Sequence, residues 1–157
     1  MSTRQTDVRA LDDQRVPVRA VLAALWTGVM LLYVYVDILA FYRPGTVEDI
    51  LDGRVWELAI TQTWATTALA LMALPILMVV LSVTLPARAG RVVNLVVAAL
   101  QLPFAAFNVV GETWVWFYGL GFALEAVLLV LVLRYAWAWP RTGAPATAAA
   151  SRAGVPA

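Results

Sequence analysis

The feature that most constrains the fold is an apolar stretch from residue 113 to residue 139, which carries a single carboxylate, Glu125, near its middle. About 20 apolar residues are enough for a helix to cross the hydrocarbon core of a bilayer, and aromatic residues gather at both ends of this stretch. The stretch therefore predicts a membrane-spanning helix. A charge near the midplane costs about 2.5–3.5 kcal/mol on insertion scales, so Glu125 is expected to face the interior of a helix bundle.

The composition of the whole chain agrees with an integral membrane protein. Of its 157 residues, 62% are hydrophobic and 13% are charged, which is too apolar for a water-soluble domain of this length. The chain contains neither Cys nor His, which excludes disulfides and removes the commonest ligands of zinc, haem and iron–sulfur clusters. The net charge of +1 gives no argument for nucleic-acid binding. We therefore expect no cofactor, no metal and no nucleic-acid partner.

Three further apolar runs predict three more spans, so that the transmembrane domain covers residues 18–140. The first run, from about residue 18 to 42, is too long for the apolar core of a signal peptide, which has about 7–15 residues. The second extends from about residue 56 to 85 and the third from about 92 to 110, and each contains a proline that interrupts the helical hydrogen bonds. Short connections between the spans predict an all-α protein, an antiparallel four-transmembrane-helix bundle.

The connections and the two ends of the chain are polar or rich in Pro and Gly. Residues 46–53 predict a short amphipathic helix on the membrane surface in the first outer loop, with Thr46 as N-cap and Asp49 as its partner in a variant capping box. Residues 1–17 predict a charged cytoplasmic segment. Residues 141–157 are of low complexity, rich in Ala and Pro, and predict a disordered cytoplasmic tail.

The arginines predict the orientation of the bundle in the membrane. All 11 basic residues are Arg, and nine of them lie towards the two termini or in a tight basic loop predicted at residues 86–91. The other side carries only Arg43 and Arg54. Because cytoplasmic loops have an excess of Arg and Lys, the sequence predicts a multi-pass protein of the inner (cell) membrane of a bacterium, with both termini in the cytoplasm.

A rise of about 1.5 Å per residue predicts the depth of each polar side chain. Glu125 and Gln101 fall at the same level near the midplane, which makes Gln101 the expected partner of Glu125, whereas Asp37 falls about 7–8 Å below the outer surface. Beyond Glu125 the fourth span is apolar, so we expect a pocket that opens outwards and is closed towards the cytoplasm. The side chains expected to bind a ligand there are Glu125, Asp37, Gln101, Asn108, Gln62, Trp114, Tyr118 and Tyr33.

Each of these features also has a purely structural interpretation. A protonated Glu125 would bond to Gln101 or to a backbone carbonyl and would only help the helices to pack. Asp37 is close enough to the surface to be hydrated, or to pair with Arg43 or Arg54. Polar residues recur every seven positions along one side of the third span, and we expect them mainly to join helices: Asn94, Gln101 and Asn108.

Three segments are similar to segments of a known family. They are residues 26–37 (WTGVMLLYVYVD), residues 41–45 (FYRPG) and, after Glu125, residues 134–140 (RYAWAWP). In this order they resemble a family of small four-span bacterial membrane proteins that is known only as a domain of unknown function. The resemblance covers roughly residues 19–141 and implies the fold and the membrane location, but it supplies no catalytic residues.

Three functions are compatible with these features. In the first, the bundle binds or moves a small hydrophobic or cationic ligand, with Glu125 and Asp37 as charged contacts and aromatic walls that suit a cation: Trp114, Tyr118, Tyr33 and Trp64. Movement of the ligand across the membrane would require a homodimer, because four spans are few for a transporter. We prefer this function because it demands least beyond a polar outer half of the bundle.

The second function is a membrane enzyme, in which Glu125 or Asp37 acts as a general acid or base on a lipid such as an isoprenoid or a quinone. The third is a structural or accessory subunit of a membrane complex. This subunit would contact its membrane partner through the surface helix at residues 46–53 and through small residues of the second span: Ala59, Thr63, Thr67 and Ala70.

Overall fold

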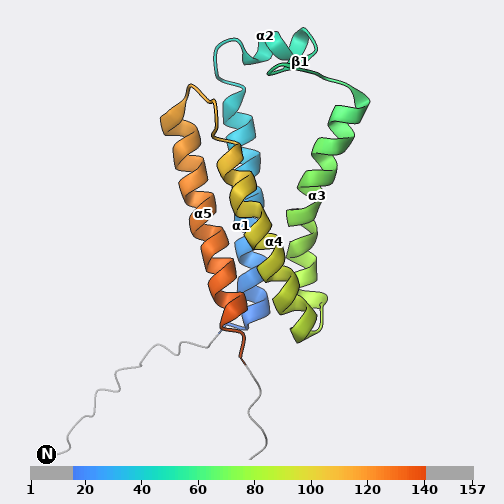
Figure 1. The fold of residues 1–157 in the computed structure, drawn as a ribbon, viewed down its shortest axis with the longest axis vertical. Coiled ribbons are helices and arrows are strands. Elements are labelled where there is room, and N and C mark those ends of the chain that lie inside the picture. Colours follow the sequence, from blue (N-terminus) through green and yellow to red (C-terminus); the bar gives the residue numbers. More distant parts are fainter. Residues whose placement is uncertain (1–15, 141–157) are drawn as a thin grey trace, which may run out of the picture.

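A computed structural model of the chain describes residues 16–140, so the predictions for residues 1–15 and for the tail at 141–157 lie outside the described residues. The described residues form a helical protein with one very small sheet, which confirms the predicted all-α class (Figure 1). The elements are α1 (Val18–Ala40), α2 (Thr46–Leu51), β1 (Arg54–Val55), β2 (Leu58–Ala59), α3 (Gln62–Thr84), α4 (Ala87–Phe107) and α5 (Val115–Trp137).

Four of the helices, α1, α3, α4 and α5, are long and apolar enough to cross a membrane, judged by length and composition. They contain 21 to 23 residues each, which corresponds to about 31–35 Å of helix. Consecutive long helices run in opposite directions (Figure 1). Both α1 and α4 pack against α3 and α5. Helices α1 and α4 are therefore diagonal partners in the bundle, and they run in the same direction.

The two ends of the bundle have different connections (Figure 1). At one end, called here the α2 end, α2 and the hairpin of β1 and β2 join α1 to α3, and a short loop joins α4 to α5. At the opposite end, called here the Pro86 end, only Leu85 and Pro86 separate α3 from α4. The described chain also starts and finishes at the Pro86 end.

Helix α3 begins at Gln62, later than the predicted start at about residue 56. The residues before it form the antiparallel hairpin of β1 and β2, and Trp56 in its turn has a left-handed φ of 56°. The hydroxyl of Thr61 then accepts a hydrogen bond from the backbone N–H of Trp64 at 3.1 Å, which caps the first turn of α3. The span predicted from hydropathy started within the hairpin, because apolar residues such as Trp and Ile occur in strands as well as in membrane helices.

Helix α4 begins at Ala87, so the basic loop predicted at residues 86–91 is wrong. Pro86 is the N-cap of α4, and Arg88 lies within its first turn. A proline at the start of a helix loses no hydrogen bond, because the first amides of a helix have no partner within it. Helix α4 ends at Phe107, which leaves Asn108 at the C-cap and not inside the span.

The predicted cap of α2 is also wrong. The N-cap is Gly45, whose φ of 86° is in the left-handed region that glycine adopts readily, and no side chain caps the helix. Thr46 is the first residue of α2, and its buried hydroxyl has no hydrogen-bond partner among the described residues. Glu48 and Asp49 still lie in the first turn, where negative charge favours the positive end of the helix dipole.

The buried apolar core lies mainly in the half of the bundle towards Pro86. Every buried residue of α3 (Pro75, Met78 and Ser82) belongs to the second half of that helix. The first half of α3 has no buried residue, and it leans away from α4 towards the α2 end (Figure 1). The core cluster consists of Leu22, Trp26, Val29, Met78, Val97, Ala98, Leu129, Val132 and Ala136.

Candidate functional site

The first of two polar clusters centres on Tyr33 of α1. The Tyr33 hydroxyl donates a hydrogen bond to Oε1 of Glu125 on α5 and accepts one from Nε2 of Gln101 on α4, the latter at 3.1 Å. Glu125 and Gln101 are each only 5% exposed. We call these three residues the Tyr33 cluster. It joins three helices in the half of the bundle towards the α2 end.

The sequence placed Glu125 and Gln101 at the same level, but the predicted direct bond between them is wrong. The phenol of Tyr33 lies between the two side chains and bonds to both. Residue depth along two helices gives the level of their side chains, and it does not reveal that a third helix inserts a ring at that level. The hydrogen bonds therefore run from Gln101 to Tyr33 and from Tyr33 to Glu125.

The second cluster centres on Asn94 of α4. Its Oδ1 accepts a hydrogen bond from Nε1 of Trp26 on α1 at 2.7 Å, and its Nδ2 donates to the carbonyl of Gly90 at 2.8 Å. The hydroxyl of Ser82 on α3 lies 3.1 Å from the same Oδ1 and 2.6 Å from the carbonyl oxygen of Met78. Trp26, Ser82 and Asn94 are fully buried, and we call them the Asn94 cluster. The buried residues of α5 beyond Glu125 are apolar, as expected, and the polar side chains in this half of the bundle come from α1, α3 and α4.

The two clusters have the same spacing along both of their shared helices. Trp26 and Tyr33 are seven residues apart on α1, and their partners Asn94 and Gln101 are seven residues apart on α4. Because α1 and α4 run in the same direction, the clusters form two successive links between the diagonal helices. Asn108, seven residues further along, is exposed at the end of α4, so the predicted polar stripe joins helices at two of its three positions.

Asp37 is separate from both clusters. It lies one helical turn from Tyr33 towards the α2 end, and its side chain is exposed. Of the two alternatives for Asp37, the exposed side chain agrees with hydration and not with pairing to Arg43 or Arg54, because each arginine pairs with an acid in the connections. Arg43 pairs with Glu112 at 2.5 Å, and Arg54 lies 4.0 Å from Asp49 and 3.8 Å from Asp52. Gln62 is exposed at the start of α3, away from the Tyr33 cluster.

The sequence analysis missed the contact between Arg43 and Glu112. Arg43 lies in the connection after α1, and Glu112 lies in the loop before α5, where its side chain is 8% exposed. The Arg43 guanidinium also lies 3.4 Å from the hydroxyl of Tyr118 and 5.9 Å from the centre of its ring. This contact ties two connections of the α2 end to α5. The sequence does not indicate that an acid and an arginine in two separate loops will lie in contact.

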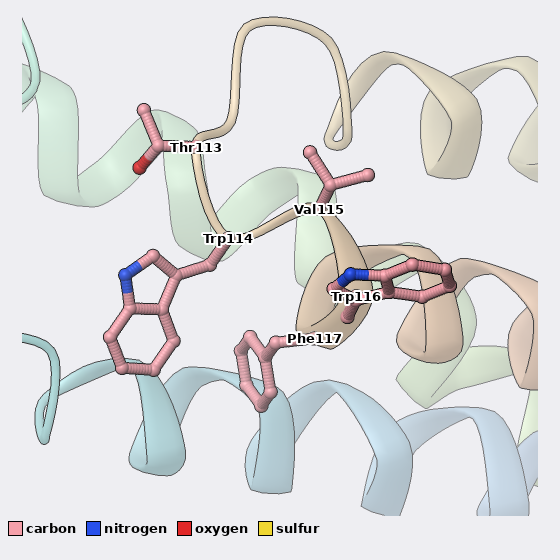
Figure 2. Close-up of a pocket in the computed structure, with 5 residues that line it drawn as sticks. All are labelled: Thr113, Trp114, Val115, Trp116 and Phe117. Atoms are coloured by element: carbon pink, nitrogen blue, oxygen red, sulfur yellow. The ribbon is translucent and has the colours of Figure 1, made fainter.

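Two shallow depressions lie on the surface near α5. One, of about 420 Å³, is lined by Thr113, Trp114, Val115, Trp116 and Phe117 (Figure 2). Trp114 and Phe117 meet edge to face with their ring centres 6.3 Å apart, whereas Trp116 points away from them and is 94% exposed. The other, of about 390 Å³, lies between α1 and α5 and is lined mostly by apolar side chains, including Leu31 and Leu124. Glu125 lines neither depression, so an outward pocket with Glu125 as its floor stays a prediction.

The chemistry that the Tyr33 cluster allows follows from the two oxygens of Glu125. Oε1 accepts the proton of Tyr33, and within residues 16–140 no hydrogen bond reaches Oε2. An ionised carboxylate has about four lone-pair positions, so this group retains capacity for a proton, a donor or a cation. Among the described residues, no group of three or more Asp and Glu side chains is arranged to hold a metal ion.

Comparison with known proteins identifies the family of the chain. Residues 11–144 match the Family of unknown function (DUF6326), and the chain belongs to this family. This match confirms the resemblance of roughly residues 19–141 to a family of unknown function. No curated protein and no solved structure matches the chain.

Proposed function

We propose that this protein binds a small hydrophobic or cationic molecule in its membrane domain. Its family has no assigned function, so the proposal rests on the side chains of the chain itself. The binding site would lie in the α2 half of the bundle, with Glu125 as the charged contact. The observation that carries this proposal is the Tyr33 cluster, in which Oε1 of buried Glu125 accepts a hydrogen bond and no hydrogen bond from residues 16–140 reaches Oε2.

A carboxylate at this depth is costly unless it has a partner. Only 5% of Glu125 is exposed, and it lies within a helix that is apolar enough to cross a membrane. Ionisable residues in such helices are rare, and they commonly mark binding sites or ion pathways. A cationic group bound at Oε2 would supply the missing opposite charge. Tyr33 and Gln101 would hold the carboxylate in position for it.

The residues between Glu125 and the α2 end suit a ligand that is both apolar and positively charged. Tyr118 lies about two turns from Glu125 on α5, and Trp114 lies one turn further at the start of that helix. Aromatic faces attract cations, and the exposed carboxylate of Asp37 adds a negative charge on α1. We propose that these three side chains contact the ligand on its way to Glu125. Gln62 and Asn108, both exposed, would act at the entrance.

The arginines support a proposed orientation with both termini in the cytoplasm of a bacterial cell. Among residues 16–140, Arg43 and Arg54 belong to the α2 end. The others lie in the terminal turns that meet at the Pro86 end: Arg19, Arg88, Arg91 and Arg134. The excess of basic residues favours the Pro86 end as the cytoplasmic side. The Tyr33 cluster would then lie in the outer half of the membrane and the Asn94 cluster in the inner half.

One observation favours a second candidate, an accessory subunit or a homodimer. The first half of α3 has no buried residue, and its small side chains Thr63, Thr67 and Ala70 are all exposed. Small residues allow helices in membranes to approach closely. Ala59 lies in β2 and is not part of this helical surface. A stoichiometric partner that remains bound after gentle solubilisation would support this candidate, and an isolated monomer would contradict it.

The enzymatic alternative has less support. A general acid and a general base on one lipid would require Glu125 and Asp37 to reach the same substrate. Asp37 lies one turn from Tyr33, the partner of Glu125, so one ligand can contact both carboxylates. Catalysis would require both of them to act on it, whereas binding requires Glu125 alone. We therefore place ligand binding first. Product formed from an isoprenoid or quinone lipid by the wild type, and lost in Glu125→Gln, would reverse this order.

The test is a binding measurement on the purified protein in lipid nanodiscs. Tetraphenylphosphonium serves as a lipophilic cation, and tetraphenylborate serves as an anion of the same shape. We expect the cation to bind more tightly, and we expect Glu125→Gln to weaken its binding at least tenfold, which corresponds to about 1.4 kcal/mol. The glutamine retains an oxygen that can accept the hydrogen bond from Tyr33, so the thermal stability is expected to remain close to that of the wild type.

The matched control is Glu57→Gln, which removes the same charge from an exposed position in the turn between β1 and β2. This variant should bind tetraphenylphosphonium as the wild type does. Equal binding of the cation and the anion, or an unchanged affinity in Glu125→Gln, would overturn the proposed function.

A further inference from the structure

The Pro86 end carries a basic surface that the proposed function does not use. It contains Arg19 in the first turn of α1, Arg88 and Arg91 at the start of α4, and Arg134 in the last turn of α5. Together with Trp137 and Trp139, we call these residues the basic surface. Within residues 16–140, every Asp and Glu lies elsewhere, in α1 and α5 away from this end or in the connections of the α2 end.

Two arginines hold the basic surface together. Nη1 of Arg19 donates a hydrogen bond to the carbonyl of Val83 at 3.0 Å, and the same guanidinium lies 6.0 Å from the ring centre of Trp139. The guanidinium of Arg91 lies 5.6 Å from the ring centre of Trp137. Trp139 itself packs on buried Gly90, where a Cβ would lie 3.4 Å from the indole. The ends of α1, α3, α4 and α5 therefore meet at this surface.

The arginines of this surface have N–H donors that make no hydrogen bond to the described residues. A guanidinium carries five N–H groups in a fixed planar fork. Arg19 donates one hydrogen bond to the described residues, through Nη1, which leaves its other N–H groups available. Nε of Arg91 is buried, so only the two terminal nitrogens of this guanidinium can reach a ligand. Arg88 and Arg134 are exposed. The stacked Trp rings hold the Arg19 and Arg91 side chains in place, so a ligand would meet a positive charge that is already positioned.

We propose that the basic surface binds the phosphate of an anionic phospholipid. The guanidinium fork matches the geometry of a phosphate, and it binds this group through paired hydrogen bonds. A lipid head group is the source favoured here, because the surface lies at the ends of four helices that are long enough to cross a membrane. Trp side chains also favour that level of the bilayer. The lipid would hold four helix ends together at the end opposite to the Tyr33 cluster.

The test uses the full-length protein in an uncharged detergent. Dioctanoyl phosphatidylglycerol is titrated against it, and dioctanoyl phosphatidylcholine serves as the zwitterionic comparison. Native mass spectrometry counts the bound lipid, and tryptophan emission follows the environment of Trp137 and Trp139. We expect phosphatidylglycerol to bind at least tenfold more tightly, and we expect the double variant Arg88→Gln, Arg91→Gln to lose at least fivefold of this affinity.

The control variant is Arg54→Gln, which removes an exposed arginine from the α2 end and should leave lipid binding unchanged. If the double variant does not fold, Arg88→Gln alone changes only an exposed side chain, and it should still weaken the binding of phosphatidylglycerol. Equal affinities for the two lipids, or an equal loss in Arg54→Gln, would overturn the proposal. Inorganic phosphate that binds as tightly as the lipid would also overturn it, because the ligand would then be a free anion. Tetraphenylphosphonium binding is measured in a separate experiment. A negative result with the lipids therefore does not bear on the proposed function.

Discussion

The Tyr33 cluster and the Asn94 cluster use the same two helices at the same seven-residue spacing, yet they differ in charge and in their third helix. The Asn94 cluster is neutral, fully buried and completed by Ser82 of α3. The Tyr33 cluster is completed by Glu125 of α5 and contains a carboxylate. A similar link between α1 and α4 therefore occurs twice. In the proposed function, the neutral cluster fixes the helices and the Tyr33 cluster supplies the contact for a ligand.

Hydrogen-bond capacity separates the two clusters further. In the Asn94 cluster, the amide oxygen and nitrogen of Asn94 and the indole N–H of Trp26 each have a partner. In the Tyr33 cluster, Oε2 of Glu125 accepts no hydrogen bond from the described residues. A cluster whose polar atoms have partners stabilises a fold, whereas a carboxylate oxygen without a donor retains the capacity to bind one. The following predictions test this difference.

The largest effect on stability is expected from Asn94→Leu. Leucine removes the acceptor of Trp26 and leaves a buried indole N–H without a partner, which costs about 1–3 kcal/mol of unfolding free energy. Denaturant unfolding in mixed micelles measures this quantity. Asn108→Leu makes the same change at the exposed third position of the stripe, and it should change the stability by less than about 0.5 kcal/mol. Equal losses at both positions would contradict a structural role that is specific to the buried cluster.

A smaller effect, on affinity, is expected from Tyr33→Phe. The change removes the hydroxyl that joins Gln101 to Glu125 and leaves the ring in place. The carboxylate then loses its positioning donor, and we expect tetraphenylphosphonium to bind about three- to tenfold more weakly, or about 0.7–1.4 kcal/mol. The control is Tyr35→Phe, two residues along α1, where the side chain is 61% exposed. An identical affinity in both variants would show that the Tyr33 hydroxyl does not support the site.

The smallest effect is expected from Ser82→Ala. Trp26 and Gly90 remain bonded to Asn94 in this variant, so only one contact between α3 and α4 is lost. Hydrogen bonds between membrane helices contribute on average about 0.6 kcal/mol, and we expect a loss of about that size. Thr67→Ala, at an exposed position of the same helix, should lower the stability by less. A loss above about 2 kcal/mol would place Ser82, and not Asn94, at the centre of the cluster.

Hydropathy and depth were enough to predict the four-helix fold and the level of the candidate site. Long apolar runs have few alternatives to a membrane helix, and a helix rises by a fixed amount per residue, so Glu125 and Gln101 could be placed at one level. The seven-residue stripe of α4 was also visible in the sequence. Helix α4 ends before Asn108, however, and the stripe ends with it. Residues 56–61 were misread because apolar side chains suit a hairpin and a helix equally.

The partners of the polar side chains could not be predicted from the sequence. Tyr33 was predicted to bind a ligand, but nothing along the chain indicated that α1 and α4 are diagonal partners. Ser82 gave no signal at all, because a single serine in an apolar helix usually bonds to its own backbone. The ion pair of Arg43 with Glu112 joins two loops that are distant in sequence. Contacts of this kind depend on how the helices are arranged around one another.

In the proposed function, the charged cluster binds a ligand and the neutral cluster stabilises the fold. The most direct test is a side-by-side titration of tetraphenylphosphonium into Glu125→Gln and Asn94→Leu in the same nanodiscs, below the unfolding temperature of both variants. We predict that Glu125→Gln loses at least tenfold in affinity, whereas Asn94→Leu, although less stable, binds the cation as the wild type does. Loss of affinity in Asn94→Leu alone, or equal affinities in Glu125→Gln and the wild type, would contradict the claim.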